Sequence, residues 1–250
     1  MTIGDYTLSR ARSVKAQRRF AANEVEKQNT ITFKPNRSRN VEIVPRTRGQ
    51  EALLLALMNP RNYAVVTAGP AGTGKTYMAM QAAIRSLKLG DCERIILTRP
   101  AIGVEDERHG FLPGDLVSKM EPWTRPLLDV MREYYHQRDI LAMIEDQVVE
   151  ISPLAYMRGR TFKNAWIIAD EMQNATPAQM KMLLTRIGEG SKIVVTGDVD
   201  QADRNARDNG LLDLITRLKA QRVNGLECCI MENRDIQRHP FISTVLDLYQ

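Results

Sequence analysis

One glycine-rich run constrains the fold of this chain more than any other feature. Residues Gly69–Thr76 read Gly-Pro-Ala-Gly-Thr-Gly-Lys-Thr and match the pattern G-x-x-x-x-G-K-[ST] in full. The apolar run Val65–Ala68 precedes it, and a helical pattern rich in alanine and methionine follows as far as Gly90. A strand, a phosphate-binding turn and a helix in this order predict an α/β domain with a parallel sheet. The alternative is a glycine-rich turn with a chance lysine.

The residue types in this turn suit a nucleoside triphosphate with its magnesium ion. Glycine lets the backbone approach a ligand closely, and the backbone N–H groups and the helix N-terminus attract phosphate. Lys75 is predicted to contact the β- and γ-phosphates, and the Thr76 hydroxyl to bind Mg²⁺. The predicted nucleotide-binding residues of the turn are Gly69, Pro70, Ala71, Gly72, Thr73, Gly74, Lys75 and Thr76.

The composition is that of a soluble globular protein. The chain has 250 residues, of which 43% are hydrophobic and 26% charged. No apolar run is long enough to span a membrane, and the N-terminus lacks the apolar core of a secretory signal, so we expect a cytoplasmic protein without a membrane partner. Cys92, Cys228 and Cys229 lack the spacing of metal ligands and are expected to be reduced.

The positive charge is concentrated near the N-terminus. Residues 1–48 hold 11 lysines and arginines against four acidic residues and so carry a net charge of +7. Because the whole chain carries +5, the remaining residues carry −2. Such an arm is expected to attract a polyanion, with nucleic acid as the first candidate. The alternative is a solvated tail without a partner. We predict a basic arm over residues 1–44 and a nucleotide-binding domain over residues 45–250.

Two further strands end in residues suited to nucleotide chemistry. Arg94–Thr98 ends at Arg99, a position where open parallel sheets bind their ligands. Ala165–Ala169 runs directly into Asp170 and Glu171. Asp170 is predicted to hold Mg²⁺ through its water shell, and Glu171 to polarise the attacking water. The alternative is an acidic exit from a strand into a loop.

Three more candidates come from separate parts of the chain. Gln201 follows the predicted strand 191–196 and is expected to sense the γ-phosphate. Gln50 lies at the start of a predicted helix, where its amide could bind the donor and acceptor edges of adenine, or could simply be exposed. Arg238 could stabilise charge in phosphoryl transfer, from its own subunit or a neighbour's, or could be a surface arginine.

The long region 101–162 does not fit a minimal strand–helix–strand unit. We expect an insertion near the site, with two or three helices through Asp146, followed by a strand over residues 148–151. A basic turn, Arg158–Thr161, follows that strand, and Arg158 and Arg160 could face the γ-phosphate or a central pore.

The assembled motifs form a characteristic set. They are the phosphate loop Gly69–Thr76, Thr98–Pro100, Gly110–Leu116 with Pro122 and Pro126, Arg158–Thr161, Asp170–Asn174, Thr196–Asp198 with Gln201, and Asp235–Pro240. Their order resembles the core of superfamily 1 helicases and, more closely, the PhoH family of phosphate-starvation-inducible ATPases of bacteria and bacteriophages. The resemblance runs from about Pro45 to the C-terminus.

The resemblance implies a RecA-like P-loop ATPase domain that uses ATP and Mg²⁺. It also implies a homo-oligomeric ring, a hexamer, and a helicase-like role on RNA or single-stranded DNA. By position it makes Gln50 an adenine contact and Arg238 an arginine finger. Ala169 and Met172 depart from the residues typical beside the acidic pair, which should alter packing but not the carboxylates. We find no second RecA-like domain in the sequence and expect translocation to require cooperation between subunits.

The function expected from the sequence is ATP hydrolysis coupled to binding or remodelling of nucleic acid. A second reading is a nucleotide-switched RNA- or DNA-binding protein that hydrolyses slowly and does not unwind. A third, a small-molecule kinase, is disfavoured because the sequence offers no separate motif for a phosphate acceptor.

Overall fold

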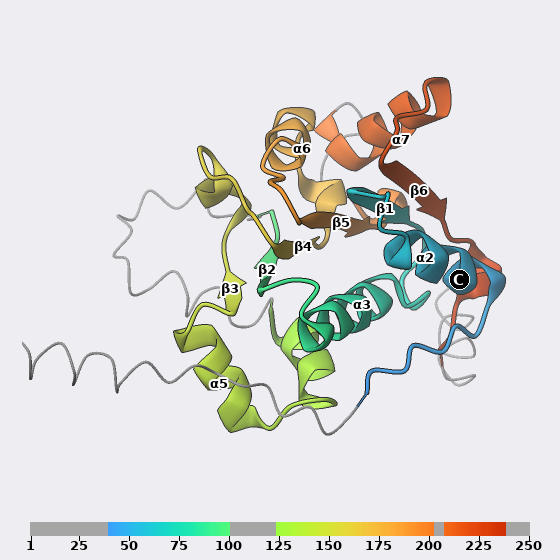
Figure 1. The fold of residues 1–250 in the computed structure, drawn as a ribbon. Helices are drawn as coiled ribbons and strands as arrows, with labels where there is room; N and C mark the ends of the chain where they lie inside the picture. The colour runs from blue at the N-terminus through green and yellow to red at the C-terminus, as the bar shows by residue number, and fades with distance from the viewer. Residues whose placement is uncertain (1–39, 101–123, 203–207, 239–250) are drawn as a thin grey trace, which may run out of the picture. The chain divides into compact units, whose positions relative to one another are not determined.

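A computed structural model describes residues 40–100, 124–202 and 208–238 of the chain (Figure 1). They form a six-stranded sheet in the order β3-β2-β4-β5-β1-β6, with every neighbouring pair parallel. The predicted fold class, a parallel sheet with flanking helices, is confirmed. The strands are β1 (Ala64–Ala68), β2 (Arg94–Thr98), β3 (Val149–Ile151), β4 (Ala165–Ala169), β5 (Lys192–Gly197) and β6 (Leu226–Ile230).

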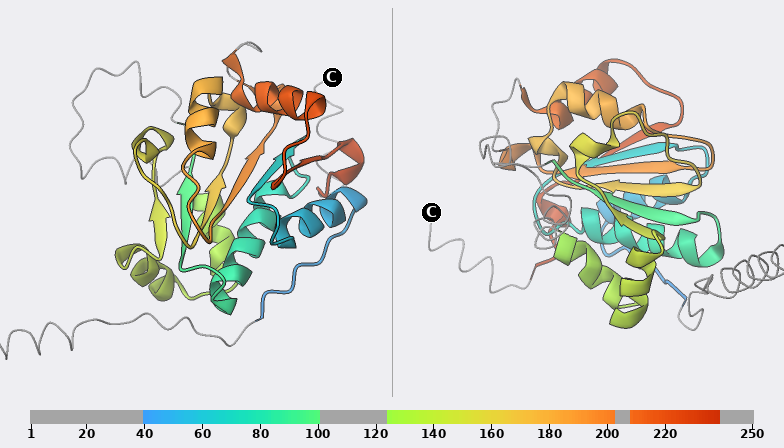
Figure 2. Two further views of the ribbon diagram at one scale, coloured as in Figure 1. Left: turned by 45° about the horizontal axis from the view of Figure 1, so that its top comes forward. Right: turned by 90° about the vertical axis from the view of Figure 1, so that its left-hand side faces the viewer.

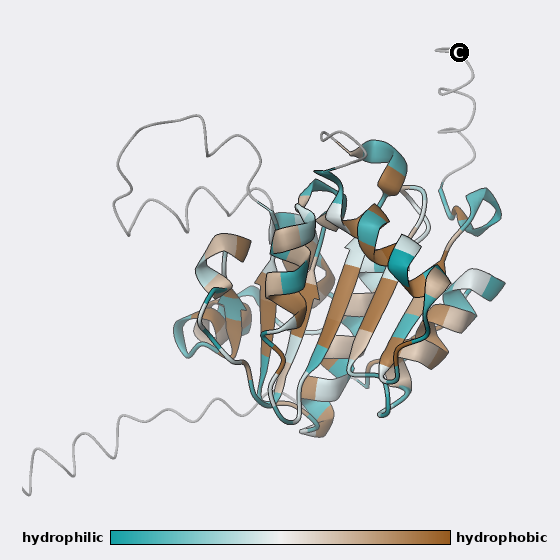
Figure 3. Cartoon of the chain, turned by 90° about the horizontal axis from the view of Figure 1, so that it is seen from above, coloured by the Kyte–Doolittle hydropathy of each residue, from teal (hydrophilic) through white to brown (hydrophobic). Residues whose placement is uncertain are grey.

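The central strands are the core of the domain. Every residue of β1, β4 and β5 is buried, whereas the edge strands β3 and β6 are partly exposed. Figure 3 shows hydrophobic residues along the strands. A parallel sheet covered on both faces favours continuous apolar runs such as Ala-Trp-Ile-Ile-Ala in β4, which explains why these strands were recognisable in the sequence.

Helices cover both faces of the sheet (Figures 1 and 2). α2 (Arg48–Met58), α3 (Lys75–Leu89) and α5 (Gln137–Glu145) lie on one side, and α6 (Pro177–Leu184) and α7 (Gly210–Ala220) on the other. Among the residues that the structure describes, no helix has both the length and the apolar character needed to cross a bilayer.

The helix ends follow from local chemistry. The Thr47 hydroxyl accepts a hydrogen bond from Gln50 N at 3.2 Å and so caps α2. Thr176 and Gln179 form a reciprocal capping box that begins α6. α6 ends at Leu184, and Ile187 beyond it forms a parallel bridge with Phe162.

The region between β2 and β4 contributes both helices and a strand. Residues 124–132 are helical, α5 follows, and β3 joins the sheet beside β2. The 3-10 helix η1 (Leu154–Met157) then leads back towards β4. Residues 101–123, with the Gly110–Leu116 segment of the resemblance, lie outside the described residues.

The three cysteines are free, as expected. Burial raises the pKa of the Cys92 thiol to about 11 and that of Cys229 to about 12, so both thiols are protonated at neutral pH.

Ordered packing begins upstream of Pro45. Val41 and Ile43 are already buried, at 6% and 8% exposure. The compact unit that contains all the described residues runs from Pro35 to Gln250.

The strand order brings distant motifs together. β5 lies between β1 and β4, and all three strands run in the same direction. The phosphate loop after β1 and the acidic pair after β4 therefore meet at the carboxyl-terminal ends of the strands, on either side of the end of β5.

Candidate active site

The phosphate loop adopts a backbone that requires glycine. Gly72 and Gly74 have φ values of 85° and 83°, in the left-handed region that side chains disfavour. At Gly69 a Cβ would lie 2.3 Å from the carbonyl oxygen of Met231, so the loop packs directly against the segment that follows β6.

Lys75 is held inside this loop at the start of α3. Its Nζ donates to the carbonyl oxygens of Gly69 at 2.6 Å and Pro70 at 2.8 Å. Burial lowers the pKa of Lys75; the carboxylates of Asp198, Asp170 and Glu171 act in the opposite direction and Arg238 adds to the lowering. A cation with little water around it attracts a phosphate more strongly than an exposed one would.

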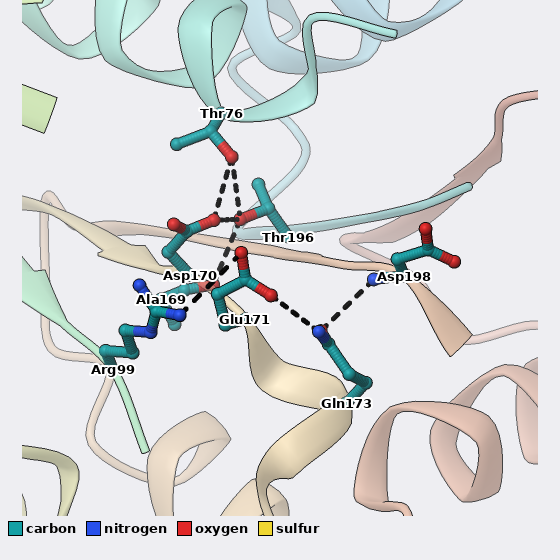
Figure 4. Close-up of polar contacts among 8 residues, drawn as sticks. All are labelled: Thr76, Arg99, Ala169, Asp170, Glu171, Gln173, Thr196 and Asp198. Atoms are coloured by element: carbon teal, nitrogen blue, oxygen red, sulfur yellow. Dashed lines mark hydrogen bonds and ion pairs between the residues drawn. The ribbon is translucent and has the colours of Figure 1, made fainter. Parts of the chain in front are cut away.

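Three oxygen-bearing side chains, those of Thr76, Asp170 and Thr196, converge at the start of α3 (Figure 4). Thr76 Oγ1 donates to Asp170 Oδ1 at 2.8 Å, and Thr196 Oγ1 donates to the same carboxylate oxygen. They come from the start of α3, the end of β4 and the end of β5. Mg²⁺ prefers hard oxygen donors of this kind, so the two predicted metal residues, Thr76 and Asp170, form a donor set that fits the ion.

Thr196 was not among the predicted site residues. Its position beside Asp170 follows from the pairing of β4 with β5: Val195 lies opposite Ala169, so Thr196 lies opposite Asp170. That pairing is not visible in a single sequence.

Glu171 is held from two sides at the mouth of the site (Figure 4). Gln173 Nε2 donates to Glu171 Oε2 at 2.5 Å, and Arg99 Nη2 lies 3.9 Å from Glu171 Oε1. The backbone of Glu171 has a φ of 55°, which is rare for a residue with a side chain and is often found at functional sites. Gln173 Oε1 also accepts from Asp198 N at 3.1 Å, so one amide joins the loops after β4 and β5.

A cavity of about 270 Å³ joins these groups. Lys75, Thr76, Asp170, Glu171 and Gln201 all line it, together with residues of the phosphate loop. Asp198 lines it as well and is buried at 7% exposure; the sequence analysis named it within the motif Thr196–Asp198 but gave it no role in the site. Its place directly after the apolar run of β5 is the signal that could have identified it.

Gln50 reaches the phosphate loop from α2. Its Nε2 donates to the carbonyl oxygen of Thr73 at 3.0 Å, and its Oε1 accepts from Arg46 N at 2.8 Å. The side chain is buried, so the alternative of an exposed glutamine is wrong. Each of these bonds leaves the amide one further N–H and one further oxygen lone pair, with which it could contact adenine.

Arg238 lies over the phosphate loop of its own chain. A Cβ on Gly72 would be only 2.4 Å from Arg238 Nε, and Gln237 N donates to the carbonyl oxygen of Gly72 at 2.8 Å. Whether Arg238 serves its own subunit or a neighbour's stays a prediction.

Arg160 is engaged away from the phosphate loop and does not line the cavity there, so the expected position at the γ-phosphate is wrong, whereas the central pore stays a prediction. Its guanidinium forms a two-pronged ion pair with Glu150 on β3 and lies 4.5 Å from the centre of the Phe162 ring. Opposite charge and an aromatic face together hold it at the edge strand.

Comparisons with known proteins agree with this site. A family model described as PhoH-like protein matches residues 42–250. A PhoH-like protein of Synechocystis sp. is 47% identical over 183 residues, which is 73% of this chain and 55% of that protein. A PhoH-like protein of Bacillus subtilis is 44% identical over 205 residues, covering 82% of this chain and 63% of that protein.

The chain thus spans between about half and two thirds of the length of these relatives. Among solved structures, the Pif1 helicase of Candida albicans aligns at a TM-score of 0.38 and 14% identity, over 82% of this chain and 44% of that one; so distant a likeness carries no argument. The family match covers most of the chain and includes the phosphate loop and the acidic pair. The chain belongs to the PhoH family.

Proposed function

We propose that this protein binds ATP with Mg²⁺ and hydrolyses it. The observation that carries the proposal is the hydrogen bond of 2.8 Å between Thr76 Oγ1 and Asp170 Oδ1, with Lys75 at the adjacent position in the loop. A hydroxyl at the start of the phosphate-loop helix and a carboxylate at the end of a parallel strand are the pair that holds Mg²⁺ in P-loop NTPases.

Each residue has a role that its position supports. The loop N–H groups and Lys75 bind the phosphates, and Thr76 and Asp170 hold the ion, which when bound would neutralise charge on the phosphate oxygens. Glu171, fixed by Gln173, orients a water and accepts its proton. Gln201 lies at the same cavity and would respond to the γ-phosphate.

Arginines supply the remaining positive charge. Arg99 lies beside Glu171 and Arg238 lies over Gly72, so each would face the triphosphate from a different side. Charge developing on the transferred phosphoryl group is stabilised by such fixed cations.

We further propose that turnover is coupled to nucleic acid. The basic segment 1–48 would contact the phosphates of RNA or single-stranded DNA, and a homo-oligomeric ring, hexameric by the family resemblance, would allow subunits to cooperate. Both statements rest on charge and on resemblance to the family.

The direct test is an ATPase assay of the full chain with and without Mg²⁺, in the presence of RNA, single-stranded DNA or duplexes with overhangs. We expect turnover that requires Mg²⁺ and rises with single-stranded nucleic acid. Nucleic-acid affinity that changes with the bound nucleotide, without stimulated turnover or strand separation, would favour the nucleotide-switched binding protein. A parent protein with no Mg²⁺-dependent hydrolysis would contradict the proposal.

The variant E171Q separates binding from chemistry. The amide keeps the size of the side chain and its contact with Gln173 but cannot accept a proton, so kcat should fall by at least about 100-fold. Binding of a fluorescent ATP analogue should stay within about threefold of the parent. Hydrolysis by E171Q at the parent rate would show that Glu171 is not the base.

A further inference from the structure

Asp235 is a buried carboxylate that the proposed mechanism does not use. It ends the 3-10 helix η5 (Asn233–Asp235) after β6 and is only 3% exposed. Its Oδ1 accepts from Gly49 N at 3.1 Å and its Oδ2 accepts from Glu232 N at 3.0 Å. The Thr47 side chain also hydrogen-bonds to it. One carboxylate thus joins the segment after β6 to the first turn of α2, 186 residues away in sequence.

The charge on Asp235 is well supported. Burial alone would raise the pKa of this carboxyl, but the hydrogen bonds from Glu232, Thr47 and Gly49 outweigh burial and lower it. The group is therefore ionised at neutral pH, and as a carboxylate it accepts hydrogen bonds at both oxygens.

On one side, this junction leads to Gln50, the predicted adenine contact. Thr47 Oγ1 accepts from Gln50 N at 3.2 Å, which orients the first turn of α2. Gln50 Nε2 then donates to the carbonyl oxygen of Thr73, and a Cβ on Gly74 would lie 3.1 Å from that nitrogen. The α2 side of the junction thus ends in a contact with the phosphate loop.

On the other side, the same junction leads to Arg238. Met231 N donates to the carbonyl oxygen of Ala68 at 2.8 Å, and Gln237 N donates to that of Gly72 at 2.8 Å. These bonds lay the segment 231–238 along the loop and leave the Arg238 side chain against Gly72. Asp235 lies between the two attachment points.

We propose that Asp235 is a positioning residue that holds Gln50 and Arg238 of one chain against the same phosphate loop. It does this by fixing the first turn of α2 to the segment 231–238. Asp235 itself does not line the cavity beside the phosphate loop and acts through the other two residues. This inference rests on the proposed ATPase function and names a residue that controls it.

Two variants break the junction from opposite sides. In D235N only one oxygen can accept, so the bonds from Gly49 N and Glu232 N cannot both persist. In G49A the new Cβ would lie 2.5 Å from Asp235 Oδ2 and displace the carboxylate, while alanine favours the helix more than glycine does. We expect each to lower kcat/KM for ATP by at least about 10-fold. D213N, the same change at a carboxylate of α7 paired with Arg217, should leave kcat/KM unchanged.

A double-mutant comparison separates positioning from simple loss of stability. If Asp235 acts through Gln50 and Arg238, adding D235N to the variant Q50A/R238A should lower kcat/KM by less than about threefold. A residual effect as large as in the parent, or full activity of a folded D235N protein, would overturn the inference. Circular dichroism checks the fold, and G49A provides the test if D235N does not fold.

The two hypotheses fail in different ways. A parent chain that does not hydrolyse ATP contradicts the proposed function and this inference with it. An active parent with active, folded D235N and G49A variants contradicts the inference alone.

Discussion

The oxygen of Asp170 that faces the phosphate loop accepts hydrogen bonds from two threonines. Thr76 is part of the recognisable loop motif, whereas Thr196 belongs to the neighbouring strand β5. Because both hydroxyls converge on the same oxygen, they orient the carboxylate before any ion is bound. Thr196 would therefore act on the proposed Mg²⁺ through Asp170.

The variant T196V tests this arrangement. Valine has nearly the shape of threonine but removes a hydrogen bond worth about 0.5–1.5 kcal/mol. We expect the Mg²⁺ concentration for half-maximal ATP hydrolysis to rise by about 2–10-fold, measured by titration with Mg²⁺. T216V, which removes an exposed hydroxyl bonded to Leu212 O on α7, is the control. An unchanged Mg²⁺ requirement in T196V would show that Asp170 does not need this partner.

Among the elements, α6 shows how local chemistry begins a helix close to the site. Thr176 Oγ1 accepts from Gln179 N at 3.2 Å, and Gln179 Oε1 accepts from Thr176 N at 2.8 Å. We expect T176A to lower the free energy of unfolding by about 1 kcal/mol, measured by urea denaturation. T185A, at the other end of the helix, should change it by less than about 0.5 kcal/mol. Equal effects in the two variants would argue against a capping role.

Lys192 joins β5 to the end of α2. Its Nζ donates to the carbonyl oxygens of Leu57 at 2.5 Å and Asn59 at 2.9 Å and lies 5.2 Å from the centre of the Trp166 ring. Burial lowers the pKa of Lys192 from 10.5 to about 8. Between these values the unfolded chain binds more protons than the folded one, so this residue makes stability increase as pH rises.

The variant K192M should remove that pH dependence. Relative to K192M, the parent should gain about 2 kcal/mol in free energy of unfolding between pH 8 and pH 10. Denaturant unfolding of both proteins at each pH measures the difference, because other titrating groups are shared. A difference that does not change with pH would mean that the amine keeps its usual pKa in the fold.

For the whole molecule, the uneven charge predicts that nucleic-acid binding and ATP hydrolysis depend on different parts of the chain. The compact unit from Pro35 holds the candidate site, whereas residues 1–34 contain seven lysines and arginines. A chain of residues 35–250 should hydrolyse ATP without nucleic acid at a rate within about twofold of the full chain. It should bind single-stranded RNA more weakly and with less dependence on salt, since each lost phosphate contact removes about 0.7 from the slope of log K against log salt.

Fluorescence anisotropy with labelled RNA at several salt concentrations measures this slope. A slope unchanged by the truncation would show that the N-terminal segment does not contact the nucleic acid. The nucleic-acid contacts would then be sought among the basic residues of the compact unit.

Much of the fold was predictable because its signals are local. The strands β1, β2, β4 and β5 are continuous apolar runs, and the ends of α3 and α6 carry glycine or a capping threonine. Lys75, Thr76, Asp170 and Glu171 were found from residue type and position at strand ends. A backbone that needs positive φ, or a helix that needs a cap, shows this within a few residues of sequence.

Other parts of the site depend on how strands and distant segments meet in space. Thr196 contacts Asp170 only because β5 lies between β1 and β4 in the sheet. Arg160 forms an ion pair with Glu150 because β3 is the edge strand beside β2. Gly49 meets Asp235 across 186 residues. Residue type and spacing within one segment thus determined its secondary structure and its candidate functional side chains. Which segments contact one another was decided by strand order and burial. Many chain paths satisfy the same local preferences, and only the packing of the core selects one of them.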